Sequence, residues 1–333
     1  MHRLKFLWLV VLTLVLFVAD LVLGSVSIPL KELPSALFSN ESEAVYREIL
    51  LQFRLPKALT AVMAGAGLSV AGLLMQTLFR NPLAGPDVLG VNAGAGLGVA
   101  LTTLLASGAG GVLLSLGSWG LVAAAILGAI VVLLLVLLTS FRVPDLVTLL
   151  IVGMMFGYIG SALVSVLQSF SNPDTLKIFI VWTFGSLSAV SWDMMPVLAV
   201  VIALGLLLSF AWIKSLNALL LGESYAIGLG VSVKRVRWVI LVATALLAGG
   251  ITAFAGPITF IGITVPHMAR GLFRTWDHRI VMPASMLCGS ALLLLCDMLA
   301  QLPGMGGTVL PINSVTALFG APMVIWILLK NNK

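Results

Sequence analysis

The stretch Trp119–Leu138 contains twenty consecutive residues without a charged side chain. A helix of that length spans about 30 Å, which matches the hydrocarbon core of a bilayer. The whole chain has this character, because 60% of its 333 residues are hydrophobic and only 9% are charged, against about 25% charged in soluble domains. Backbone groups in hydrocarbon must be paired within the protein, which favours helices. We therefore predict an all-α polytopic membrane protein.

Further apolar runs divide the chain into about ten predicted transmembrane helices. We place them at 6–24, 56–79, 88–107, 117–139, 146–168, 193–213, 236–256, 258–273, 280–301 and 308–329. The range 258–273 is short and interrupted. Residues 175–187 are typical of a short surface helix rather than of a crossing. We expect residues 1–333 to form a single transmembrane domain.

The basic residues are distributed unevenly between the two sides that these spans define. With the N-terminus inside, thirteen of the 18 Lys and Arg residues fall on the inner side and five on the outer side. Inner loops of membrane proteins carry an excess of Lys and Arg, so both termini are predicted to be inside. The same rule explains the net charge of +6. The sequence contains no basic run with interleaved aromatic residues, so it does not predict nucleic-acid binding. We expect the protein to be surrounded by membrane lipid.

Two of the outer cations lie in the sequence QFRLPKAL, immediately before the second predicted span. Arg54 and Lys57 have no acidic residue in their immediate run. Two acids, Asp20 and Asp297, fall inside predicted spans, where an ionisable residue is a functional candidate by default. Both lie near span ends, so a capping or snorkelling role is at least as well supported.

The glycine-rich sequence Gly94-x-Gly96-x-Gly98 invites comparison with a phosphate-binding loop. It does not follow a predicted strand, and no Gly-Lys dipeptide occurs in the sequence. A Walker A nucleotide site requires that lysine. No Ser/His/Asp set or carboxylate pair predicts catalysis. We expect no enzyme active site, no metal site and no cofactor in this chain.

The segment 214–238, KSLNALLLGESYAIGLGVSVKRVRW, is the largest polar connection on the inner side. Its glycines and alternating apolar residues fit a helix–turn–helix lying on the membrane surface. An ordinary basic loop that anchors the next span fits equally well. A second irregular stretch, 255–270, contains two prolines and two glycines that break an apolar run. Such a break is tolerated in a membrane only where neighbours or water satisfy the freed backbone groups.

Several ordered blocks carry a family resemblance: RLPKALTAVMAGAGLSVAGLLMQTLFRNPLAGPDVLGVNAGAG, WTFGSLSAVSW, LNALLLGESYAIGLGV, GPITFIGITVPHMAR, DHRIVMPAS and LPINSVTALFGAPMVIWILLK. Together they resemble the FecCD-type permeases, the membrane subunits of ABC importers for iron-siderophores, haem and cobalamin. The resemblance implies a type II ABC importer permease fold in the bacterial inner membrane. It also implies two ATPase subunits that hold ATP and Mg, a periplasmic or lipid-anchored binding protein, and a dimer with a second copy or a paralogue.

The resemblance also assigns roles to residues. The outer Arg54 and Lys57 match cations that dock the binding protein. The segment that contacts the ATPase corresponds to Gly222, Glu223, Ala226, Gly228 and Gly230. Positions that narrow the inner side of the path correspond to Asn81, Leu83, Leu146 and Val147. Where relatives often carry a further docking arginine, this chain has Gln301.

The competing interpretation is a secondary transporter driven by an ion gradient. That class needs paired acids or ion-coordinating residues near the middle of the membrane. Asp20 and Asp297 are too few and too close to span ends to provide them. The expected function is therefore that of a permease subunit in an ATP-driven importer, with metal-chelate selectivity residing mostly in the binding protein.

Overall fold

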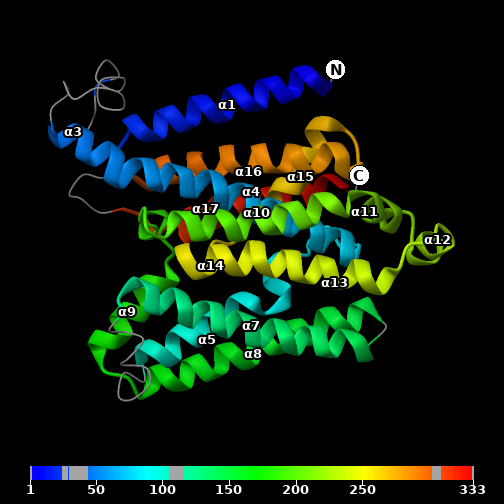
Figure 1. Cartoon of the computed structure of the whole chain (residues 1–333), viewed down its shortest axis with the longest axis horizontal. Helices are drawn as coiled ribbons and strands as arrows, with labels where there is room; N and C mark the ends of the chain where they lie inside the picture. Colours follow the sequence, from blue (N-terminus) through cyan, green and yellow to red (C-terminus); the bar gives the residue numbers. More distant parts are fainter. Residues whose placement is uncertain are drawn as a thin grey trace.

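A computed structural model describes residues 2–24, 29, 44–104, 116–143, 145–301 and 309–331. All regular secondary structure within these ranges is helical, as predicted. The predicted span ends at 105–107 and 308 lie outside the described residues. Long helices run side by side, and both chain termini and α12 (Glu223–Gly228) lie at the same end of the molecule (Figure 1). We call this the α12 end.

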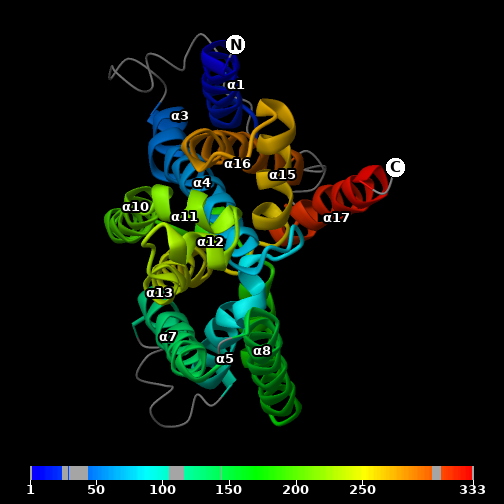
Figure 2. The ribbon, with the colours of Figure 1, turned by 90° about the vertical axis from the view of Figure 1, so that its right-hand side faces the viewer.

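The first group of helices is built around α4. The helix packs against α16 and α15, while α1 packs against α16, and α17 packs against α15 and α16. Figure 2 shows α1, α3, α15 and α16 in the upper part of the molecule, with α17 extending to the right. A short helix and a π-helical turn lead into α4 without a break. The bounds are α1 (His2–Val22), α3 (Ala44–Glu48), η2 (Ile49–Arg54), α4 (Leu55–Phe79), α15 (Ile261–Phe273), α16 (His278–Gln301) and α17 (Ile312–Asn331).

The second group consists of three helices, with α5 packed against both α7 and α8. It forms the lower part of the molecule in Figure 2. A short helix, α9, lies near the end opposite α12 (Figure 1), in the range where a short surface helix was predicted. The bounds are η3 (Pro86–Leu89), α5 (Val91–Leu104), α7 (Ser118–Arg142), α8 (Leu146–Ser169) and α9 (Pro173–Thr183).

The remaining helices lie between the two groups. The helices α10 and α13 pack against α4, whereas α14 packs against α7. A π-helical turn, η5, joins α13 to α14 and contacts both α4 and α7. The bounds are η4 (Leu187–Ala189), α10 (Met195–Ala211), α11 (Ile213–Leu220), α13 (Val233–Thr244), η5 (Ala245–Gly249) and α14 (Gly250–Ala255).

Helices occupy all ten predicted ranges, but their lengths differ. Six of the described helices are long and apolar enough to cross a membrane, and α10 with α11 makes a seventh if the pair, bent by 57°, counts as one span. The ranges Val91–Leu104 and Ile312–Ile325 are shorter apolar helices. The count of ten crossings therefore stays a prediction.

The irregular stretch at 255–270 breaks the helix as its prolines and glycines predict. The helix α14 ends at Ala255, and α15 begins at Ile261. The freed backbone groups have partners: Ser186 N donates to the Ala255 carbonyl at 2.7 Å, and Thr259 N donates to Asn313 Oδ1 at 3.2 Å. Neighbouring segments thus provide hydrogen-bond partners for backbone groups at the break, as a break in a membrane helix requires.

Glycines in α4 let two other backbones approach it closely. A Cβ atom added at Gly65 would lie 2.3 Å from the Gly289 carbonyl oxygen of α16. One added at Gly72 would lie 1.8 Å from the Gly262 carbonyl oxygen of α15. Lipid supplies no hydrophobic drive for helices to associate, so close packing at small residues holds such pairs together. These two contacts fix the spacing of α4, α15 and α16.

We predict that Gly72→Ala destabilises the protein by about 1–3 kcal/mol, the cost typical of overpacking. The new methyl group would meet the backbone of α15, which cannot rotate away as a side chain can. Gly271→Ala in α15 is the matched control, since a Cβ atom there meets nothing within 4 Å. Unfolding by denaturant in mixed micelles measures both. Equal stability of the two variants would contradict the close approach of α4 and α15.

Candidate coupling and docking sites

The segment 214–238, which we call the coupling segment, folds as a helix–turn–helix, the first of the two structures predicted for it. It contains α11, the short helix α12 and the start of α13. Both turns that flank α12 use glycine in conformations that other residues rarely adopt, with φ of 120° at Gly222 and 80° at Gly230. Glycine has no Cβ and reaches these angles without steric cost. The predicted coupling residues thus form one compact element.

Apolar side chains of α12 face away from the protein. Tyr225 and Ile227, together with Leu229 just after the helix, are exposed, whereas Ala226 is fully buried against the bundle. The helix projects beyond the ends of the long helices (Figure 1). An apolar group that projects this way is typical of a surface that another protein covers.

A buried hydrogen-bond network holds α11 against the first group of helices. The Asn217 amide donates to Asp277 Oδ1 at 2.6 Å, and its oxygen accepts from His278 N at 2.9 Å. The ring of His278 has a partner at each nitrogen: Nδ1 lies 2.8 Å from Asn217 Oδ1, and Nε2 lies 2.8 Å from Thr77 Oγ1 in α4. Because His278 is buried and bonded at both ring nitrogens, α11 has a fixed attachment to α4 and α16.

Two arginines make further contacts around the segment 214–238. Arg80, at the end of α4, donates to the Leu219 carbonyl at 3.3 Å. Arg237, which belongs to the part of α13 inside the segment, lies 3.6 Å from Glu223 Oε1 of α12 and donates to the Val143 carbonyl at 3.2 Å. The segment is therefore joined to α4 and to the end of α7.

A cavity of about 750 Å³ lies at the α12 end, where coupling residues and one gate candidate meet. Its lining comes from the end of α4, the start of α8 and the α11–α12 turn. The lining residues are Arg80, Asp145, Leu146, Leu221, Gly222, Glu223, Ser224 and Tyr225. The other gate candidates, Asn81, Leu83 and Val147, do not line it. Leu83 and Val147 are exposed, and Val147 directly follows the lining residue Leu146 in the sequence.

Local hydrogen bonds shape the two turns that carry the gate candidates. Asn81 Oδ1 accepts from Leu83 N at 2.9 Å, which closes a tight turn after α4. Asp145 caps α8 by accepting from Thr148 N and Thr148 Oγ1, both at 2.7 Å. These bonds to the charged form hold the pKa of Asp145 below its usual range. The start of α8 is thereby fixed next to Leu146.

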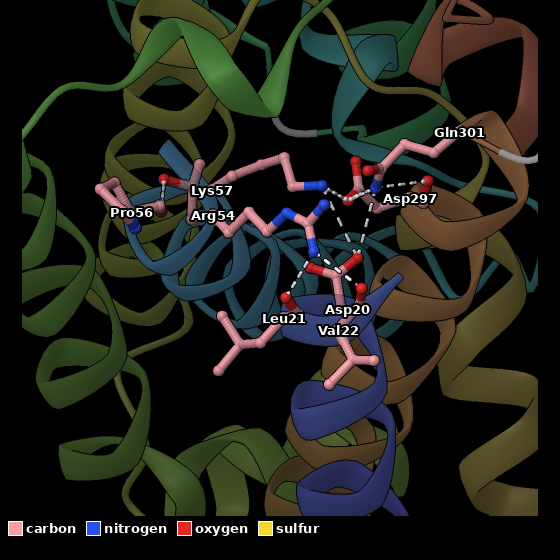
Figure 3. Close-up of polar contacts among 9 residues, drawn as sticks. Asp20, Leu21, Val22, Arg54, Pro56, Lys57, Asp297 and Gln301 are labelled. Carbon is pink, nitrogen blue, oxygen red and sulfur yellow. Dashed lines mark hydrogen bonds and ion pairs between the residues drawn. The ribbon is translucent and has the colours of Figure 1, made fainter. Parts of the chain in front are cut away.

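At the opposite end, Arg54 and Lys57 lie beneath the surface, exposed by only 6% and 7%. Arg54 Nη1 donates to the carbonyls of Leu21 and Val22, both at 2.8 Å (Figure 3). Carbonyls in the last turn of a helix have no intrahelical partner. The guanidinium therefore caps the C-terminus of α1.

Lys57 has the acidic partners that its own stretch of sequence lacks. Its Nζ lies 2.6 Å from Asp297 Oδ2 and 3.8 Å from Asp20 Oδ1. Gln301 Nε2 donates to Asp297 Oδ2 at 2.7 Å and to Asp20 Oδ1 at 3.5 Å (Figure 3). We call Asp20, Arg54, Lys57, Asp297 and Gln301 the charge cluster. Its two cations and two acids join α1, α4 and α16.

This pairing is not evident from the sequence, because the partners are far apart along the chain. One signal was available: in the predicted topology, the end of the first span, the start of the second and the end of the ninth all face the outer side. The docking role of Arg54 and Lys57 stays a prediction. The contributions of Asn217 and Arg237 were also missed, since neither residue belongs to a recognisable motif.

The helical bundle, the projecting α12 and the broken α14–α15 segment define a class of protein. It is the multi-pass membrane permease of an ABC importer, which moves a solute rather than catalysing a reaction and works with ATPase and binding-protein partners. The model of the FecCD transport family matches residues 12–330. The chain belongs to that family.

Individual relatives agree with this assignment. The vitamin B12 import system permease protein BtuC of Escherichia coli O127:H6 is 36% identical over 327 residues, covering 97% of this chain and 95% of the relative. BtuC of Salmonella paratyphi A is 38% identical over 284 residues, covering 84% and 83%. An inward-facing structure described as a metal-chelate type ABC transporter matches with a TM-score of 0.85 and 31% identity, covering 98% and 99%.

We predict that Lys57→Met destabilises the protein by about 3–5 kcal/mol, because two buried carboxylates lose their nearest cation. The double variant Lys57→Met/Asp297→Asn is expected to recover much of this loss, since it removes one uncompensated charge. Denaturant unfolding in mixed micelles measures the coupling between the two substitutions. Additive effects in the double variant would show that the pair does not interact.

Proposed function

We propose that this chain forms the translocation path of an ATP-driven importer for a metal chelate such as cobalamin, haem or a ferric siderophore. The relatives and the structural match support this class of substrate, because one imports vitamin B12 and another is a metal-chelate type transporter. The observation that carries the coupling role is α12, a short helix that begins at Glu223 and carries exposed apolar residues at one end of the bundle.

The proposed assembly contains two copies of the permease, or this chain and a paralogue, with two ATPase subunits at the α12 end. ATP and Mg are held by those subunits, and this chain has no nucleotide site of its own. Both termini lie at the α12 end (Figure 1). This supports an N-in and C-in orientation in the bacterial inner membrane, with the charge cluster at the outer face.

The surroundings of the acids weigh against coupling to an ion gradient. Asp20 and Asp297 both belong to the charge cluster at one end of the bundle, where Lys57 and Gln301 bind them. An ion-driven carrier needs ionisable groups that exchange ions near the middle of the membrane. A carboxylate held by lysine and an amide near a helix end is poorly suited to that exchange.

For the outer face, we propose that Arg54 and Lys57 support a periplasmic or lipid-anchored binding protein by fixing the helix ends on which it docks. Arg54→Gln is then expected to lower the affinity for the binding protein by about tenfold, because the end of α1 loses its two capping bonds. Lys177→Gln is the control, since Lys177 is an exposed cation of α9 near the same end. Binding to the permease in nanodiscs measures both, and an unchanged affinity for Arg54→Gln refutes the proposal.

For the inner face, we predict that Glu223→Lys abolishes co-purification of the ATPase subunit with the tagged permease in mild detergent. The substitution places a cation beside Arg237 and reverses the charge on the surface of α12. Glu48→Lys is the control, because Glu48 is exposed at the opposite end of the bundle. The proposed function would be overturned if the wild-type permease purified without an ATPase subunit and moved vitamin B12 into proteoliposomes without ATP.

A further inference from the structure

Arg237 links α12 to the second group of helices. It lies in the second turn of α13 and is largely buried. One nitrogen, Nη2, is 3.6 Å from Glu223 Oε1 at the start of α12. Another, Nη1, donates to the Val143 carbonyl at 3.2 Å, at the end of α7. A single planar group thus contacts two segments that are distant in the sequence.

We infer that Arg237 is a positioning residue that transmits displacement of α12 to the start of α8. The inference rests on the proposed function, in which the ATPase contacts α12. Val143 lies two residues before Asp145, the N-cap of α8, and three residues before the gate candidate Leu146. Movement of Glu223 pulls on the guanidinium, which is also bonded to the backbone at Val143.

The flanking turns allow α12 to move as a unit. Gly222 and Gly230 adopt positive φ angles on either side of it, and glycines tolerate large changes of backbone angle at low cost. The cavity lies between α12 and the start of α8, with Glu223 on one side and Leu146 on the other. Displacement of α12 therefore meets little packed material in this direction, and Arg237 is the charged contact that joins the two sides.

The shape of arginine suits this position. Its guanidinium presents several N–H donors in a fixed plane, so it can bind a carboxylate and a carbonyl at the same time. Lysine carries one compact charge on a flexible stem and cannot hold both partners in a fixed geometry. Glutamine keeps donor capacity but loses the charge that attracts Glu223. Substituting lysine or glutamine for Arg237 therefore distinguishes a residue that links two partners from one that supplies only a positive charge or only side-chain volume.

The test uses the complete transporter, with its ATPase subunits, in nanodiscs. Spin-label pairs at Leu4 and Ser224 report on α12, and pairs at Leu4 and Ile151 report on the start of α8. All three side chains are exposed, Ser224 is not one of the apolar residues assigned to the ATPase contact, and the buried Cys288 and Cys296 are replaced by alanine. Pulsed electron resonance measures each distance without nucleotide and with Mg-ATP. In the otherwise unmodified protein, both distances are expected to change with nucleotide.

In Arg237→Gln and Arg237→Lys, the Leu4–Ser224 change is expected to remain, while the Leu4–Ile151 change falls by about twofold or more. Arg235→Gln is the matched control, because Arg235 is an exposed cation on the same helix. It should leave both changes intact. Equal Leu4–Ile151 changes in Arg237→Gln and Arg235→Gln would overturn the role of Arg237 alone. If the Leu4–Ser224 distance did not change with nucleotide in the protein that keeps Arg237, both the inference and the proposed coupling role of α12 would be overturned.

Discussion

The close contact between α4 and α16, where Gly65 meets Gly289, fixes both ends of the molecule. At one end, α4 begins beside Lys57 and α16 finishes at Asp297 and Gln301, so their side chains meet in the charge cluster. At the other end the same two helices hold the coupling segment through Thr77, Asp277 and His278. A shift of α4 along α16 would disturb the charge cluster and the contacts of α11 together, and the glycine contact opposes it.

The charge cluster has a cost that the fold offsets by balancing charge. Removing a carboxylate or an ammonium from water is unfavourable by several kcal/mol, and only well-placed partners compensate for it. Lys57 supplies a cation to Asp297 at 2.6 Å, while Gln301 donates to the same carboxylate. Arg54 binds the backbone at the end of α1. The cluster thus stabilises the junction of α1, α4 and α16 and also specifies which helix ends meet there.

The sequence predicts the helices better than it predicts their neighbours. The charge-free run around Trp119–Leu138 marks α7 almost to its ends, and the glycines and prolines near Gly256 mark the break between α14 and α15. Local composition determines both features. It contains no information about Lys57 meeting Asp297 or Arg237 meeting Val143, because such pairs depend on how distant helices pack. The coupling residues are predicted only through the resemblance to a family.

The coupling segment combines a firm attachment with a looser one. Asn217 holds α11 through bonds of 2.6 to 2.9 Å to residues at the start of α16, with His278 buried behind them. The contacts of Arg237 with α12 and α7 are longer, at 3.6 and 3.2 Å, and Glu223 is partly exposed. Since α12 is flanked by Gly222 and Gly230, displacement concentrates there rather than in α11. A force on α12 is therefore resisted by the first group of helices and reaches the second group through Arg237.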